Sequence, residues 1–169
     1  MKKNILLIVS VIFVLTGCVK KEKQSFNKRD EMNLLMADEI VKCINKEDID
    51  SLYALFSAKV KTQDLNLKED IKKLYKYLNG QVVSCEKWAV GSTTEIENEI
   101  NSTYYFSSFK IVINKIDYYL YYIYFPRNDF DSSREGIRSL KIVKVDEDDK
   151  YFCYWQSLKP GVFLPDEAK

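Results

Sequence analysis

The sequence of 169 residues contains no histidine. Without imidazole, the chain cannot form the hydrolase triads built on histidine, the commonest zinc sites or the usual proton shuttle near neutral pH. It also shows no P-loop, no Rossmann glycine motif and no nucleophile elbow. These absences predict that the protein carries no cofactor and no catalytic metal.

An excess of charge of one sign is missing as well. The chain has 26 lysines and arginines against 25 aspartates and glutamates, which gives a formal net charge of +1. Nucleic acids attract proteins through strongly basic surfaces. The balanced charge therefore argues against a nucleic-acid partner.

No apolar run is long enough to span a bilayer. The longest, Ile5–Leu15, is interrupted only by Ser10 and is well short of the roughly 20 residues that a transmembrane helix needs. It follows two basic residues, Lys2 and Lys3. A basic start and a short apolar core are typical of a secretory signal peptide.

The end of this segment, Leu15-Thr16-Gly17-Cys18, resembles the lipobox of bacterial lipoproteins. The resemblance implies that residues 1–17 are removed and that Cys18 receives diacylglycerol. Two acyl chains would hold the protein stably on the extracytoplasmic face of the cell membrane. An ordinary secretory signal with an incidental cysteine is the alternative.

Residues 18–29 are polar and lack a periodic apolar face, which predicts a short tether. Its lysines either contact anionic lipid headgroups or are simply solvated. Residues 30–169 are enough for a single domain with its own core.

Three cysteines remain beyond Cys18, and no two of them form a CxxC pair. Neither a redox motif nor a cysteine metal site is therefore expected. At most one disulfide can form within the chain, and Cys85 with Cys153 is the best pair because both lie in strand-like segments. The alternative is that Cys43, Cys85 and Cys153 are buried free thiols.

Apolar residues at helical spacing predict three helices in the first half of the domain. They cover about residues 30–45, 48–57 and 68–78, and Asn79-Gly80 is a stop signal for the last. The polar stretch 59–66 carries no such pattern.

After Gly80 the pattern becomes alternating, which predicts β-strands. The expected strands cover about residues 81–90, 103–114, 116–125, 137–145 and 151–158. A tight hairpin is expected at Asn114-Lys115, and the polar run 91–101 is a loop or a weak edge strand.

Helices followed by strands predict an α+β domain in which helices pack on one face of a curved antiparallel sheet. This order looks like the cone-shaped fold of the nuclear-transport-factor-two-like (cystatin-like) superfamily. Together with the lipobox, the "LYALF" helix at Leu52–Phe56 is similar to an uncharacterised family of small lipoproteins from low-GC Gram-positive bacteria. The domain resemblance covers roughly residues 30–165 and assigns no functional residue besides Cys18.

A group of aromatic residues could line a ligand cavity, since the resemblance implies that the sheet and helices enclose a pocket. The alternative is that these rings are ordinary core and interface bulk. The candidates are Trp88, Tyr118, Tyr122, Tyr124 and Trp155.

Two carboxylates allow an alternative enzymatic interpretation. The resemblance includes ketosteroid-isomerase and dehydratase types, in which a buried aspartate acts as base. Asp117 and Glu86 are the strand carboxylates available for that role. The acidic loop 129–135 fails the calcium-loop pattern, because Arg134 and Leu140 stand where a glycine and a bidentate glutamate are required.

The strand 116–125 is apolar on both faces. One face can meet the helices, and the other needs a cover. Either the segment Val162–Leu164 covers it, or a second copy or an envelope protein does; we expect the latter. The sequence thus favours a membrane-tethered, non-enzymatic module that binds a small ligand, a peptide or another envelope protein.

Replacing Cys18 with serine is expected to abolish lipid attachment, because Cys18 ends the lipobox-like segment. Metabolic labelling with a fatty-acid analogue should label the wild type and leave Cys18→Ser unlabelled. Equal labelling of both proteins would contradict the anchoring interpretation.

Overall fold

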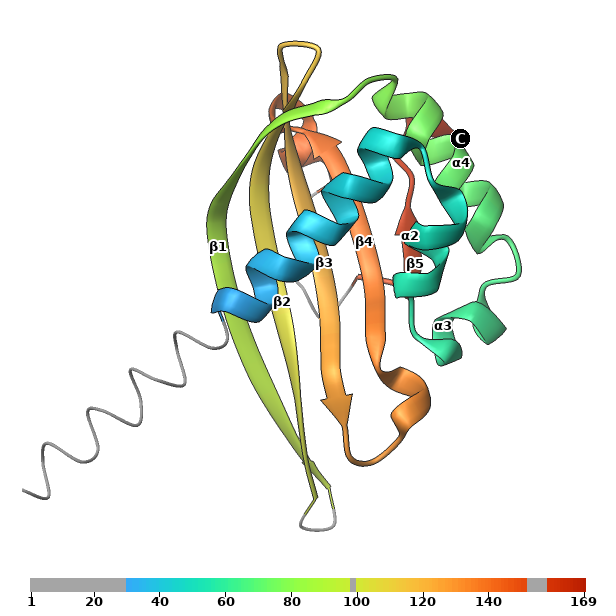
Figure 1. Cartoon of the computed structure of the whole chain (residues 1–169), viewed down its shortest axis with the longest axis vertical. Helices are drawn as coiled ribbons and strands as arrows, with labels where there is room; N and C mark the ends of the chain where they lie inside the picture. The colour runs from blue at the N-terminus through green and yellow to red at the C-terminus, as the bar shows by residue number, and fades with distance from the viewer. Residues whose placement is uncertain (1–29, 98–99, 152–157) are drawn as a thin grey trace, which may run out of the picture.

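The structure, a computed structural model, describes residues 30–97, 100–151 and 158–169. Helices lie against one face of a twisted sheet that does not close into a barrel (Figure 1). The predicted α+β class, with helices first and strands afterwards, is confirmed. No helix in the described part of the chain has both the length and the apolarity needed to cross a bilayer.

The three predicted helices are present. An N-terminal helix over residues 30–46 runs diagonally across the sheet (Figure 1), followed by α2 (Ile49–Leu55) and α4 (Leu67–Leu78). Between them lies α3 (Ala58–Gln63), which the sequence pattern did not predict because this short helix buries only one residue, Val60.

Five strands form one sheet in the order of the chain. They are β1 (Val82–Glu97), β2 (Ile100–Ile113), β3 (Ile116–Asn128), β4 (Gly136–Lys144) and β5 (Gly161–Phe163). The first four pair antiparallel, whereas β5 runs parallel to β4. The prediction of a purely antiparallel sheet is therefore wrong: the chain crosses back between β4 and β5 and re-enters the sheet in the same direction.

The predictions about individual strands and turns had mixed outcomes. The hairpin at Asn114-Lys115 is confirmed, and both residues have the positive φ values (51° and 66°) that a two-residue turn of this kind requires. The polar run 91–97 is part of β1, because its backbone pairs with β2 as far as Glu97. Most of the predicted last strand lies outside the described residues, and Tyr151 belongs to the 3₁₀ segment η2 (Val145–Tyr151).

The main core lies between the helices and the inner face of the sheet. A buried polar contact fixes the N-terminal helix on that face. Asn33 is fully buried, and its side-chain oxygen accepts a hydrogen bond of 2.6 Å from the Ser107 hydroxyl. Its backbone carbonyl accepts a hydrogen bond from the Tyr122 hydroxyl. Because buried polar groups are costly unless paired, these contacts specify where the helix crosses the strands.

The outer face of β3 is covered in part by its own chain. Ile123 and Phe125 are buried and pack with Leu158 in a second, smaller cluster. The alternative cover, the segment Val162–Leu164, takes this role only in part. Val162 and Leu164 pack on the main core at the helix side, whereas Phe163 lies next to Lys141 and Tyr151.

A buried lysine on β4 fastens η2 to this outer face. The Lys141 side chain is only 4% exposed, and its ammonium donates to the Asp148 carboxylate at 3.2 Å and to the Tyr151 carbonyl at 3.0 Å. The Tyr121 hydroxyl donates to the same carboxylate at 2.8 Å. The charge is therefore both paired and hydrogen-bonded, as a buried ammonium requires.

Lys141→Ala is expected to lower the free energy of unfolding by about 3–5 kcal/mol, because it removes one partner of a buried ion pair. Lys141→Met should lower it less than Lys141→Ala, since methionine keeps the packing of the aliphatic lysine stem, although Asp148 loses its ion-pair partner in both. The control Lys42→Ala breaks an exposed pair with Glu39 and should change the free energy of unfolding much less, because exposed ion pairs contribute little to stability. Urea unfolding measures all three, and a Lys141→Ala loss no larger than the control would refute this role.

Candidate functional site

The structure brings three of the predicted pocket aromatics together and separates the fourth. Tyr118 and Tyr122 are buried in the main core, and Tyr124 packs against it. Burial raises the pKa of each of these tyrosines, so their hydroxyls stay protonated. Trp155 lies outside the described residues.

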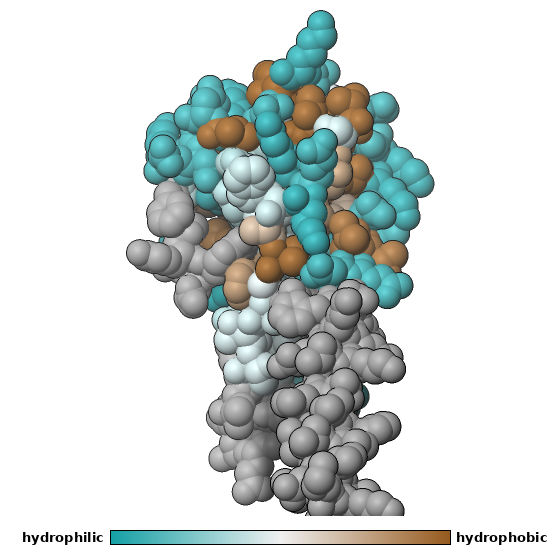
Figure 2. Space-filling view, turned by 90° about the vertical axis from the view of Figure 1, so that its left-hand side faces the viewer, coloured by the Kyte–Doolittle hydropathy of each residue, from teal (hydrophilic) through white to brown (hydrophobic). Residues whose placement is uncertain are grey.

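Trp88 lies on the outer face of the sheet, where its ring contacts that of Tyr119 at 5.7 Å between centroids. It occupies an irregularity of β1, between the pairs that Lys87 and Ala89 form with β2, and is 64% exposed. Seen from the β1 side, hydrophilic and hydrophobic side chains of the described residues are intermingled (Figure 2). Whether a second copy of the chain or an envelope protein covers the outer face of β3 stays a prediction.

The two carboxylates of the enzymatic interpretation lie outside the core. Asp117 sits next to the β2–β3 hairpin and forms an ion pair with Lys110 at 2.7 Å, with nearly half of its side chain exposed. Glu86 is exposed on β1. A base of the buried kind would need a carboxylate inside the apolar layer, and neither residue is placed there.

Cys43 and Cys85 form no disulfide with any other residue that the structure describes. Burial raises the pKa of Cys85 to about 11 and also raises the pKa of Cys43. The predicted partner of Cys85, Cys153, lies outside the described residues, so their pairing stays a prediction.

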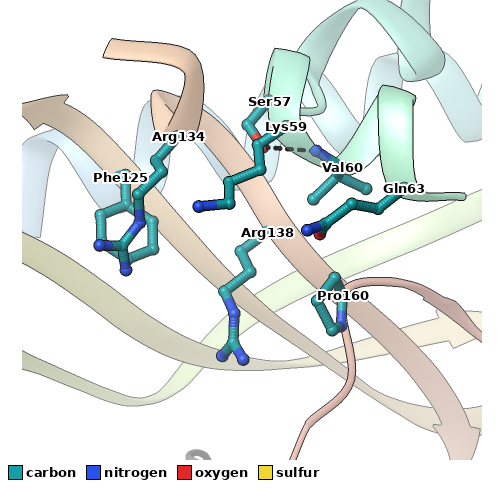
Figure 3. Close-up of a pocket in the computed structure, with 8 residues that line it drawn as sticks. All are labelled: Ser57, Lys59, Val60, Gln63, Phe125, Arg134, Arg138 and Pro160. Atoms are coloured by element: carbon teal, nitrogen blue, oxygen red, sulfur yellow. Dashed lines mark hydrogen bonds between the residues drawn. The ribbon is translucent and has the colours of Figure 1, made fainter. Parts of the chain in front are cut away.

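A pocket of about 350 Å³ lies where α3, the end of β3 and the start of β4 meet (Figure 3). Its wall brings together residues that no sequence motif connects. It is lined by Ser57, Lys59, Val60, Gln63, Phe125, Arg134, Arg138 and Pro160.

A close backbone contact holds the two sides of the pocket together. Phe56 forms a parallel bridge with Ile137, and the Ser57 amide donates to the Ile137 carbonyl at 3.0 Å. Gly136 permits this approach, because a Cβ there would lie 2.8 Å from the Leu55 carbonyl oxygen, and its φ of +115° also favours glycine. The contact places α3 opposite the start of β4.

Arg138 enters the pocket from a β-bulge. Ile123 pairs with Ser139 and Tyr124 pairs with Ile137, so Arg138 between them has no partner on β3. Bulges redirect side chains and are frequent next to functional sites. Arg138 forms no hydrogen bond or ion pair with any other residue that the structure describes.

The acidic loop after β3 supplies the opposite wall. The Asp131 carboxylate accepts hydrogen bonds from Ser133, which lower its pKa, and it caps the 3₁₀ turn η1 (Ser132–Arg134). The turn places the Arg134 guanidinium over the Phe125 ring, 4.8 Å from its centroid. Among the described residues, no group of three or more metal-ligating side chains is close enough to hold a metal ion.

The polar side chains that line the pocket can all donate hydrogen bonds. Lys59, Arg134 and Arg138 are cationic, Gln63 offers an amide, and none of the described residues that line the wall is acidic. In Figure 3 the Lys59 and Gln63 side chains extend from α3 toward the side of the pocket that holds the two arginines. The Lys59 ammonium lies 3.5 Å from Asp131, which partly offsets its charge. Such a wall suits a ligand that only accepts hydrogen bonds, such as an oxyanion.

Fold and pocket together define a small α+β domain with a cationic pocket at one end of its sheet. The chain belongs to the family described as "Domain of unknown function (DUF5104)", which it matches over residues 39–145, more than half of its length. A search of curated proteins found no match.

Sequence reasoning missed the residues of this pocket. Arg134 and Arg138 lie four residues apart in a stretch taken for a solvated loop and the start of a strand. Lys59 and Gln63 lie far upstream in a segment that carries no apolar pattern. Their proximity follows from the contact at Gly136, for which the glycine alone was a weak signal.

The raised pKa of Cys85 predicts slow alkylation, because only the thiolate reacts. At about pH 8, iodoacetamide should modify Cys85 on the order of 100-fold more slowly in the folded protein than in urea. Mass spectrometry of the Cys85 peptide measures both rates separately from the other cysteines. Rates within a factor of about three would contradict a buried, protonated thiol.

Proposed function

We propose that the protein is a lipoprotein of the extracytoplasmic membrane face whose domain binds a small anionic ligand without transforming it. The observation that carries the proposal is the pocket wall, in which the described residues include three cationic side chains and no carboxylate. Oxyanions are bound in proteins by such charge-assisted hydrogen bonds, and arginine is especially suited to them.

The location part of the proposal rests on the first 18 residues. A basic start, a short apolar core and the ending Leu15-Thr16-Gly17-Cys18 are what a lipoprotein signal requires. A lipid on Cys18 would leave residues 19–29 as the link between the membrane and the N-terminal helix.

Kinship with the nuclear-transport-factor-two-like cone is part of the same proposal. Helices followed by a twisted sheet support it, whereas the parallel β5 is a departure from a simple meander. Within that fold the interior would normally hold the ligand. Here Tyr122, Phe109 and Leu120 fill the space beneath the N-terminal helix, so we assign binding to the pocket at the end of the sheet.

Lys59→Met is expected to weaken binding of a small anion by about tenfold, because it removes one charge-assisted hydrogen bond worth about 1.5–3 kcal/mol. Lys42→Met is the matched control, since Lys42 is an exposed helical lysine paired with a carboxylate in the same way. Calorimetric titration of phosphate, sulfate and succinate at constant ionic strength measures the affinities.

The proposal requires that at least one of these anions binds the wild type and that Lys42→Met leaves its affinity unchanged. Background heats for all three anions would refute it. An equal loss in both lysine variants would refute it too, because it would reflect the net charge of the protein and not this pocket.

A further inference from the structure

We propose that the ligand of this pocket carries a phosphoryl group, as a small phosphate monoester held between Lys59, Arg134 and Arg138. This inference rests on the proposed function, because it concerns the same pocket, and it adds the chemical class of the ligand. Two features of the wall favour a phosphoryl group over a carboxylate, the directions of the donors and the total charge, and the apolar part of the wall favours an ester over inorganic phosphate.

The donors approach the pocket from three separate elements. Lys59 and Gln63 come from α3, Arg134 from η1 and Arg138 from the bulge of β4 (Figure 3). A carboxylate has two oxygens in one plane, and one guanidinium fork satisfies it. A phosphate monoester has three strong acceptor oxygens pointing in different directions, which suits donors that come from three different elements.

One buried hydroxyl adds a further donor. Ser57 is 2% exposed, and its oxygen accepts from the Val60 amide at 3.3 Å. Its own hydrogen has no acceptor among the described residues, so it remains available to a ligand oxygen.

The charge of the wall favours a dianion. Three cationic side chains line the pocket, and part of their charge is offset by Asp131 beside Lys59 and by the interactions of Arg134 within the protein. A monoester carries a charge of about −1.5 to −2 at pH 7, whereas a single carboxylate carries one. Arg138 in particular lacks an anionic partner in the described protein, and a half-buried guanidinium is stabilised when a ligand supplies one.

Apolar side chains in the pocket wall indicate an organic substituent on the phosphate. Phe125, Val60 and Pro160 give the wall apolar surface beside the cations. The volume of about 350 Å³ also falls in the range of small-molecule sites and exceeds what a bare anion needs. An ester with a small apolar body would fill the pocket better than inorganic phosphate.

Titration of the purified full chain with four matched anions tests the inference. Phenyl phosphate, phenyl sulfate, benzoate and phthalate share one ring and differ in the shape and charge of the anionic group. We expect phenyl phosphate to bind at least about tenfold more tightly than the other three at constant ionic strength near pH 7.5. Arg138→Met should remove at least about tenfold of that affinity, whereas Arg127→Met, at an exposed arginine outside the pocket, should leave it unchanged.

The outcomes separate the two proposals. Equal affinity for phenyl phosphate and any of the other three anions overturns the phosphoryl assignment and leaves anion binding intact. Binding of none of the four overturns the phosphoryl assignment, and the proposed function is overturned as well if phosphate, sulfate and succinate also fail to bind. Phenyl phosphate binding that survives Arg138→Met overturns the assignment to this pocket.

Discussion

Burial of β3 on both of its faces is the constraint on which the rest of the fold depends. Its inner side chains, among them Leu120 and Tyr122, lie beneath the N-terminal helix, while Ile123 and Phe125 on the outer side pack with Leu158. A strand that is apolar on both faces needs two covers. The helices supply the first. On the second, residues after β4 contribute, and Lys141 holds η2 in place.

This requirement also explains the form of the C-terminal part. The chain crosses back after β4 and ends as the short parallel strand β5, with Val162 and Leu164 turned to the helix side. Residues 158–164 thereby contribute to both layers of the molecule. The place where β4, β5 and α3 come together is also where the pocket forms, with Pro160 as part of its wall.

The sequence predicted those features that a local pattern encodes. The helical spacing before residue 79 located three helices, and Asn114-Lys115 located the β2–β3 hairpin. The parallel β5 could not be predicted, because its direction depends on the path of the chain over the sheet and not on its three residues. The pocket could not be predicted for a related reason. Arg138 reaches the pocket through a β-bulge, and Lys59 lies on a helix with only one buried residue. Neither feature produces a periodic pattern of apolar residues in the sequence.

The composition of charged residues also predicted the electrostatics of the molecule only in part. The nearly neutral net charge correctly describes a surface on which many charges are paired, such as Lys42 with Glu39 and Lys68 with Asp50. An average over the chain says nothing of a local concentration of cations, and the wall of the pocket is one.

The contact at Gly136 has a thermodynamic consequence. It joins α3 to β4, two segments far apart in the sequence, so the pocket exists only while the domain is folded. A compound that fills it binds the native state and not the unfolded chain, and by mass action it raises the stability of the native state. A bound ligand should therefore also slow proteolysis of the domain.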